Sequence, residues 1–215
     1  MCNLYSQKNS LQEVRDWFDV TIIDPSAGNL PEQKAIFPAY HAPVVYLENN
    51  DRKITMMNWG FILKQSGKAI KHVNNCRDDK VMSSQFWKSS FVNRRCLVPA
   101  SRFSEYHPNV RNKKGHKASV WFELSEEPIF AFAGIWTKFT GYYKGEFSEF
   151  NTYSIITTTP NGLVQPIHPS RMPVIIKQSN YKSWLNGTIK TADGLIRTYP
   201  ADQMRVAHIG LNTDD

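Results

Sequence analysis

Ile129-Phe130-Ala131-Phe132-Ala133-Gly134-Ile135-Trp136 is the longest of several runs that are rich in β-branched and aromatic residues. The other runs lie at residues 43–47, 53–58, 95–98, 118–124, 151–157 and 174–176. Residues of these types favour the pleated, half-buried surface of a β-strand. Many short strands with few helices indicate an α+β fold built on one curved, mostly antiparallel sheet.

Helices are expected only as short pieces. Residues 11–18 place their apolar side chains on one helical face, and further helices are expected at residues 80–87 and 181–185. Residues 109–117 separate two strand candidates and are typical of an exposed hairpin loop. We expect its charges to form a solvated tip, with a binding site as the alternative. Because no repeat or flexible linker divides the chain, we expect a single domain over residues 1–215.

The composition is that of an ordered globular protein, with 41% hydrophobic and 13% aromatic residues. Lysine and arginine number 26 against 19 acidic residues, a net charge of +7 that favours a polyanionic partner such as nucleic acid. No apolar run approaches the ~18 residues of a membrane span. The polar start lacks the apolar core of a secretory signal, so we expect a cytoplasmic, DNA-associated protein without a membrane partner.

Cysteine usage excludes two kinds of site. Cys2, Cys76 and Cys96 make an odd number without a Cys-x-x-Cys pair, so neither a disulfide framework nor a structural zinc site is indicated. We expect a reducing compartment and no cofactor or metal.

Cys2 follows the initiator methionine directly. Removal of Met1 would leave an α-amine and a thiol on one residue. The amine has an ordinary pKa of ~7.7–8.0 against ~10.4 for lysine, and the thiol an ordinary pKa of ~8.5. An N-terminal Cys2 would therefore be the strongest amine nucleophile of the chain, unless burial lowers the pKa of a lysine. The alternative is that a cysteine stands at position 2 by accident and has no function there.

Three further polar spots interrupt the apolar background: residues 74–79, residues 103–106 and residues 167–173. Glu105 lies in an aromatic run, where an apolar pocket would raise its pKa and make it a proton carrier. Taken singly, Glu105 is better explained as a strand glutamate that points to solvent, and His168 as a structural histidine. Arg77 and Arg171 could be surface ion-pair partners or phosphate ligands.

Together these motifs resemble the SRAP family, the SOS response-associated peptidases that crosslink abasic sites in single-stranded DNA. The shared order is Met1-Cys2, Asn-x-Arg at residues 75–77, Arg-Arg-Cys-Leu-Val-Pro-Ala at residues 94–100 leading into Phe-x-Glu, Thr-Thr-Pro-Asn at residues 158–161, and His168 before Met-Pro-Val-Ile at residues 172–175. The resemblance covers residues 1–207 and implies a barrel-like fold.

The chain departs from the family pattern in places. Asn3-Leu4-Tyr5 stand where Gly-Arg-Phe is usual, so an expected basic contact at position 4 is missing. The segment from His168 to Pro173 is one residue longer than the family's His-Asp-Arg-Met-Pro. These changes affect the expected DNA contacts and leave the expected chemistry in place.

The resemblance implies a role for each candidate. Cys2 would close a thiazolidine on the abasic sugar, Asn75 would fix the nucleophile, and Glu105 and His168 would carry protons. Phosphate contacts are expected from Arg77 and Arg171, and base stacking from Trp59 and Trp87. We expect a monomer whose partner is single-stranded DNA containing abasic sites, with self-removal of Met1 and crosslink reversal as related activities.

Two other classes remain open at this stage. An N-terminal-nucleophile amidotransferase or peptidase also opens with Met-Cys, but the pairs Asn161-Gly162 and Asn186-Gly187 come late for its oxyanion element. A single-stranded-DNA-binding module without catalysis would explain the basic charge alone.

Overall fold

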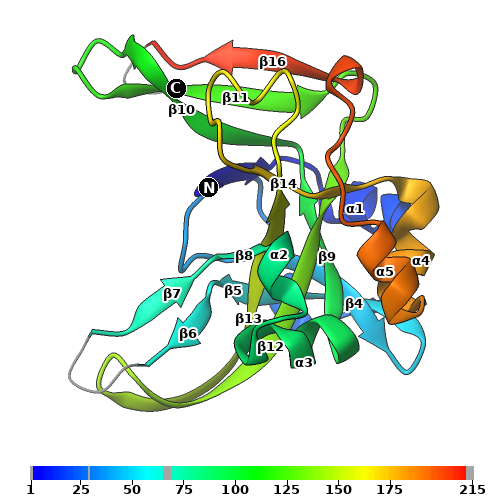
Figure 1. The fold of residues 1–215 in the computed structure, drawn as a ribbon. Helices are drawn as coiled ribbons and strands as arrows, with labels where there is room; N and C mark the ends of the chain where they lie inside the picture. Colours follow the sequence, from blue (N-terminus) through cyan, green and yellow to red (C-terminus); the bar gives the residue numbers. More distant parts are fainter. Residues whose placement is uncertain (1, 29, 65–68, 212–215) are drawn as a thin grey trace.

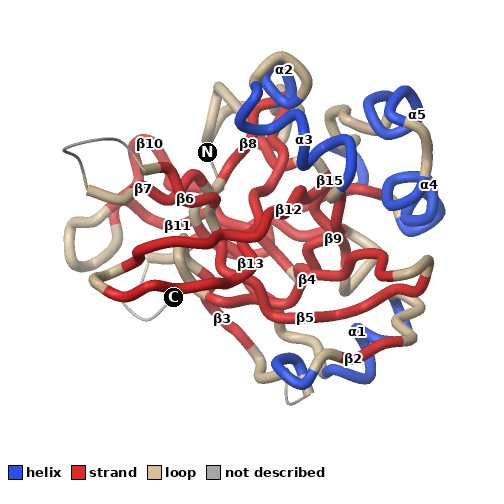
Figure 2. The backbone as a smooth tube through the Cα atoms, turned by 90° about the horizontal axis from the view of Figure 1, so that it is seen from below, coloured by secondary structure: helices blue, strands red, loops and turns tan. Residues whose placement is uncertain are grey.

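The protein, described from a computed structural model, is resolved over residues 2–28, 30–64 and 69–211. Its centre is a closed barrel in which β13 (Glu146–Thr158), β12 (Phe130–Tyr143), β9 (Arg95–Ala100), β4 (His41–Glu48) and β5 (Asp51–Trp59) pair in that order. The ring closes where β5 meets β13 in parallel, with Asn58 opposite Thr152 and Trp59 opposite Tyr153. The barrel forms the lower part of the molecule in Figure 1 and is seen from below in Figure 2.

A second sheet covers the upper end of the barrel in Figure 1. Its strand order is β16 (Met204–Ile209), β11 (Lys117–Leu124), β10 (Arg102–Arg111), β1 (Leu4–Gln7) and β3 (Gln33–Ile36). β1 is therefore an inner strand, with Leu4 opposite Ser104 on β10. This pairing holds the segment that follows Cys2 between β10 and β3.

Short strands extend the barrel wall. β8 (Asn75–Arg77) runs parallel to β13, β14 (Met172–Pro173) also pairs with β13, and β15 (Ile175–Ile176) pairs with β12. β2 (Ile22–Ile23) joins β5, and β6 (Phe61–Leu63) with β7 (Lys71–Val73) makes a separate ribbon. β8 and β14 bring the segments around residues 75 and 170 to one strand.

The helices are short, as expected. They are α1 (Leu11–Trp17), α2 (Asp78–Val81), α3 (Gln85–Asn93), α4 (Tyr181–Asn186) and α5 (Ile189–Gly194). The prediction of a single helix over residues 80–87 is wrong, because two helices, α2 and α3, share this segment. The chain breaks between α2 and α3, where the Ser84 side chain caps α3 by accepting a hydrogen bond from the backbone N–H of Phe86.

Strand alternation divides the core between the two faces of the barrel wall. Val98 and Phe132 belong to the cluster that also holds Cys2, whereas Leu97 and Ala133 belong to the cluster beneath the helices. Gly134 is required by close approach, because a Cβ there would lie 2.7 Å from Cys96 Sγ.

The expected α+β class with a barrel-like, mostly antiparallel sheet and short helices is confirmed. The hairpin expected at residues 109–117 is present, but its turn is only residues 112–116, because β10 extends to Arg111 and β11 begins at Lys117. Strands β1, β3 and β16, and the extension of β12 and β13 into a long hairpin, were not expected. Among the described residues, no helix has the length and apolar character needed to cross a membrane.

Candidate functional site

Cys2 lies just before β1, and its side chain is fully buried. The thiol donates a weak hydrogen bond to Leu4 O at 3.7 Å. The Cys2 carbonyl oxygen accepts hydrogen bonds from Asn75 Nδ2 at 2.8 Å and Asn74 Nδ2 at 3.3 Å. Both amides act on the carbonyl side of Cys2, so they hold the residue whatever precedes it.

Asn75 opens β8 and is buried beside Cys2. Among the described residues, no donor reaches Asn75 Oδ1, although this atom is buried. A buried amide oxygen without a partner costs free energy, about 1–3 kcal/mol, which a donor arriving at the site would recover.

Asn74 is a site residue that sequence reasoning missed. Its Nδ2 also donates to Asn3 Oδ1 at 2.7 Å, and its carbonyl accepts from Trp59 Nε1 at 2.9 Å. The Asn74-Asn75 pair was visible in the sequence, but no spacing rule shows that both amides converge on one carbonyl.

Glu105 lies on β10 opposite Val120, with only 5% of its surface exposed. Burial raises the pKa of Glu105 to about 7. Burial also raises the pKa of the Cys2 thiol, and the Glu105 charge raises it further. The ionisation of Glu105 therefore makes the Cys2 thiol harder to deprotonate. At neutral pH the thiol is protonated, while the Glu105 carboxyl is near half ionisation.

His168 lies half-buried in the loop before β14. Its Nδ1 accepts a hydrogen bond from the backbone N–H of Arg171 at 3.2 Å, so the neutral ring carries its proton on Nε2. Burial lowers the pKa of His168, and the positive charge of the chain's amino end lowers it further. The ring is thus neutral at pH 7 and responds to the same end of the chain as Glu105, whose pKa that charge also lowers.

Both predicted phosphate ligands are ion-paired. Arg77 donates from Nε and Nη2 to the two carboxylate oxygens of Asp79, at 2.9 Å each. Arg171 pairs with Asp78 and, at 3.2 Å, with Asp79. Thr158 Oγ1 donates to Asp78 at 2.7 Å, which ties this pair to the end of β13. The Arg77 side chain is 52% exposed and that of Arg171 only 13%, so the two arginines are in different situations.

The stacking role predicted for Trp59 and Trp87 does not fit the structure. Trp59 is fully buried, edge-on to Tyr5 at 5.0 Å, and Trp87 is 7% exposed against Phe61. Neither indole offers a ring face to a base. Aromatic rings that are accessible include Tyr40, 52% exposed in the loop whose backbone bonds with that of Trp59.

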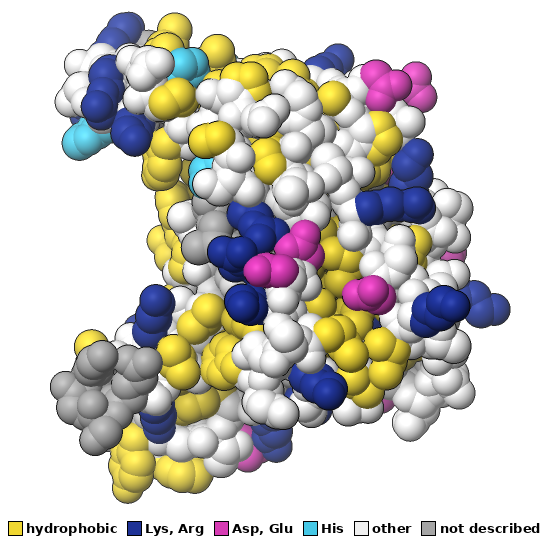
Figure 3. Space-filling model, in the orientation of Figure 1, with side chains coloured by type: hydrophobic (Ala, Val, Ile, Leu, Met, Phe, Trp, Pro, Cys, Tyr) yellow, Lys and Arg dark blue, Asp and Glu magenta, His cyan; other side chains and the backbone are white. Residues whose placement is uncertain are grey.

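The structure thus brings Cys2, Asn75 and Glu105 together in the interior. His168 is linked to them only by the charge of the amino end, which lowers the pKa of both His168 and Glu105. Figure 3 shows the molecule hollowed on one side, between an upper arm at the β10–β11 hairpin and a lower arm at β6, β7 and the β12–β13 hairpin. β1 begins at the inner end of this hollow (Figure 1).

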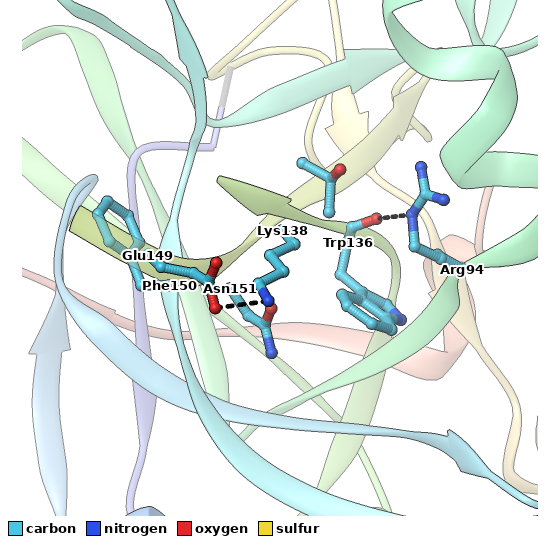
Figure 4. Close-up of a pocket in the computed structure, with 7 residues that line it drawn as sticks. Arg94, Trp136, Lys138, Glu149, Phe150 and Asn151 are labelled. Atoms are coloured by element: carbon cyan, nitrogen blue, oxygen red, sulfur yellow. Dashed lines mark hydrogen bonds and ion pairs between the residues drawn. The ribbon is translucent and has the colours of Figure 1, made fainter. Parts of the chain in front are cut away.

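A separate groove of about 590 Å³ lies on the β12–β13 hairpin (Figure 4). Its polar groups bind one another: Lys138 pairs with Glu149 at 2.5 Å, and Arg94 Nε donates to Trp136 O at 3.1 Å. None of the predicted site residues lines it.

The Asn161-Gly162 pair offers no side-chain amide for an amidotransferase oxyanion site. Asn161 is buried and donates to Tyr199 O at 2.8 Å, while its Oδ1 accepts the backbone N–H groups of Leu163 and Val164. The Asn161 amide already makes these hydrogen bonds, which stabilise the turn.

Comparison with known proteins gives consistent results. The chain is 26% identical over 218 residues to abasic site processing protein YoaM of Bacillus subtilis (strain 168), covering 97% of this chain and 91% of the relative. Abasic site processing protein YoqW of Bacillus phage SPbeta is 26% identical, with 97% and 92% coverage.

Solved structures share the fold. A protein from Bacteroides thetaiotaomicron superposes with a TM-score of 0.77 at 22% identity, covering 95% of this chain and 90% of its own. One from Bordetella bronchiseptica gives 0.75 at 18% identity, covering 95% and 97%. The model of the SOS response associated peptidase (SRAP) family matches residues 1–212. The chain belongs to the SRAP family.

Proposed function

We propose that this protein processes abasic sites in single-stranded DNA by forming a covalent thiazolidine crosslink through Cys2. The observation that carries the proposal is the convergence of three side chains on Cys2. The amides of Asn74 and Asn75 donate to its carbonyl, and the Glu105 carboxyl lies close enough for its charge to raise the pKa of the thiol. The proposal requires removal of Met1, which lies outside the described residues. The names of the Bacillus relatives, abasic site processing proteins, support the substrate class.

The chemistry follows from the aminothiol. The Cys2 amine attacks the aldehyde of the ring-opened sugar, and loss of water gives an imine. The S–H bond then adds across the C=N bond, so that sulfur bonds to carbon and the proton goes to nitrogen. The second step is intramolecular, where effective molarities reach ~10⁵ M or more. It removes the imine that would otherwise acidify the neighbouring C–H bond and lead to strand cleavage.

The neighbouring groups suit these steps. Glu105, with a pKa of about 7, can take a proton from the amine or the thiol and return it, since a proton carrier works best when its pKa is near the ambient pH. Asn75 Oδ1 can accept an N–H of the freed amine. The Nε2–H of neutral His168 can donate to the sugar oxygen during ring opening.

Intact-mass measurement after incubation with abasic single-stranded DNA tests the proposal. We expect the Met1-less protein plus the DNA less one water, in an adduct that survives denaturation. Borohydride reduces an imine and adds two hydrogen atoms, but leaves a thiazolidine unchanged, so an unchanged adduct mass is expected. A cleaved strand without an adduct would support a lyase, and ammonia released from glutamine would support an amidotransferase.

Arg77 and Arg171 are predicted to behave differently on mutation to alanine. The exposed Arg77–Asp79 pair contributes only ~0–1 kcal/mol, so Arg77 can exchange Asp79 for a phosphate. Arg77→Ala should flatten the log–log salt dependence of DNA affinity by up to about 0.7, with little change in Tm. Arg171→Ala should instead lower stability by ~1–3 kcal/mol, because it leaves the half-buried Asp78 without its cation.

Salt titration of binding and thermal unfolding distinguish the two roles. A flattened slope with unchanged stability for Arg171→Ala would show that Arg171 is a phosphate ligand after all.

A further inference from the structure

The turn of the β10–β11 hairpin carries a concentration of positive charge that the site does not use. We call Arg111, Lys113, Lys114 and Lys117 the basic tip; all are exposed. The sequence contains no acidic residue between Glu105 and Glu123. Within the described part of the chain, no member of the basic tip has an ion-pair partner, in contrast to Arg77 and Arg171.

The backbone of this turn is held in place. Asn112 Oδ1 accepts the backbone N–H groups of Lys114 and His116 at 3.0 Å each, and Asn112 N donates to His116 O at 2.8 Å. Lys113 N donates to Leu211 O at 3.0 Å, which ties the turn to the segment after β16. Gly115 supplies the left-handed conformation that the turn needs, with φ +80°. The like charges are therefore held close together, an arrangement that a polyanion stabilises.

The position of the basic tip relates it to Cys2. β10 contains both Glu105 and Arg111, which are about 20 Å apart along the strand at ~3.3 Å per residue. The hairpin forms the upper arm of the hollow, and dark blue side chains gather at its end (Figure 3). A single strand leaving a lesion at Cys2 along β10 would therefore bring phosphates only a few nucleotides away to the basic tip.

We infer that the basic tip binds the phosphates of the nucleic-acid strand flanking the lesion, on one side only. The inference rests on the proposed function for the identity of the strand. Contacts from lysine and arginine to phosphate position a strand without reading its sequence. The basic tip thereby lengthens the DNA contact beyond the hollow and holds the strand in register while Cys2 reacts.

The test compares Arg111→Gln/Lys113→Gln/Lys114→Gln/Lys117→Gln with a control of equal charge loss, Arg15→Gln/Lys88→Gln/Lys182→Gln/Lys190→Gln. Each variant lowers the net charge of +7 by four, and the control residues lie on helices α1, α3, α4 and α5. The ligands are single-stranded oligonucleotides with a stable abasic analogue that has no aldehyde. One carries about two nucleotides on each side of the analogue, and the others extend it by about twelve on the 5′ or the 3′ side.

Binding is measured across a salt series, so that the result does not depend on crosslinking. The tip variant should match the wild type on the short oligonucleotide. On one of the two extended oligonucleotides it should bind at least about tenfold more weakly, with a salt slope flatter by ~0.7 for each phosphate that the variant no longer neutralises. The control should retain the wild-type slope on every oligonucleotide.

Three results with the oligonucleotides would overturn the inference. They are equal losses of affinity on short and extended oligonucleotides, equal losses in tip variant and control, and wild-type binding throughout. Selective loss of binding to anionic vesicles would assign the basic tip to a lipid surface instead. Failure of the proposed function would appear separately, as the absence of a covalent adduct between the wild type and an aldehyde-bearing oligonucleotide.

Discussion

Cys2→Ala is expected to abolish the denaturation-resistant DNA adduct completely. Alanine at the N-terminus retains an α-amine and can still form an imine, but it has no sulfur to close the five-membered ring. The imine hydrolyses or leads to strand cleavage, so the DNA should be recovered free or broken. Denaturing gels and intact mass, each with and without borohydride, measure the difference: only the reduced sample of Cys2→Ala should show an adduct.

Cys96→Ala is the matched control. Cys96, like Cys2, is fully buried and belongs to the same core cluster. Its replacement by alanine therefore also removes one buried sulfur atom from that cluster. It should keep the wild-type yield of adduct, whatever its effect on stability. A full yield of unreduced, heat-stable adduct from Cys2→Ala, or an equal decrease in both variants, would contradict the assignment of Cys2.

Glu105→Gln should slow crosslinking by about 10²–10⁴-fold at pH 8, the usual contribution of a general acid–base group. Glutamine keeps the shape and hydrogen-bonding capacity of the side chain but cannot exchange a proton. The wild-type rate should rise with pH as Glu105 ionises around its pKa of about 7, and this rise should be missing from the variant. Because the Cys2 amine titrates in both proteins, the ratio of the two rates is the quantity to follow.

The same substitution should change stability in a pH-dependent way. Burial raises the Glu105 pKa from 4.5 to about 7 on folding, so between these values the folded protein binds more protons than the unfolded chain. The free energy of unfolding of the wild type therefore falls as pH rises through this window, by up to ~3 kcal/mol. Glu105→Gln escapes this decrease and should gain stability relative to the wild type between pH 5 and pH 8, measured by urea unfolding.

Glu123→Gln is the control for both measurements. Glu123 lies on β11, next to β10, where its carboxylate pairs with Arg205 at 2.7 Å. Its substitution should leave the crosslinking rate unchanged. If Glu105→Gln reacts at the wild-type rate, or loses activity together with stability at every pH, Glu105 is a structural residue.

Local pattern was sufficient where a residue's neighbours along the chain determine its environment. The runs at residues 118–124 and 130–136 do lie in strands, as their composition predicted. Glu105 is buried in its aromatic strand, which is one of the two environments that the sequence left open. Local pattern failed for Trp59 and Trp87. An aromatic residue in a basic protein is equally consistent with a core position and with a surface that stacks on bases, and only packing distinguishes them.

The charged residues around position 77 show a second limit of local pattern. The sequence left two roles open for Arg77 and Arg171, which are far apart in the chain: surface ion-pair partner and phosphate ligand. In the folded protein Asp79 pairs with Arg77, two residues away in the chain, and also with Arg171, which pairs with Asp78 as well. The two contacts of Arg171 form because β8 and β14 meet at β13. A cation's availability depends on which acids the fold brings to it, and that information is not local.

The amino-acid sequence by itself determined that this protein is strand-rich, that its second residue is a potential aminothiol, that Asn75 lies in a polar cluster, and that Glu105 and His168 are polar positions in apolar surroundings. These are properties of composition and short-range periodicity. Tertiary structure decided that β5 closes a barrel against β13, that β1 lies inside a second sheet, and that the amides of Asn74 and Asn75 meet at the Cys2 carbonyl. Each of these joins residues distant along the chain, and such pairings depend on the packing of the whole core rather than on any local preference.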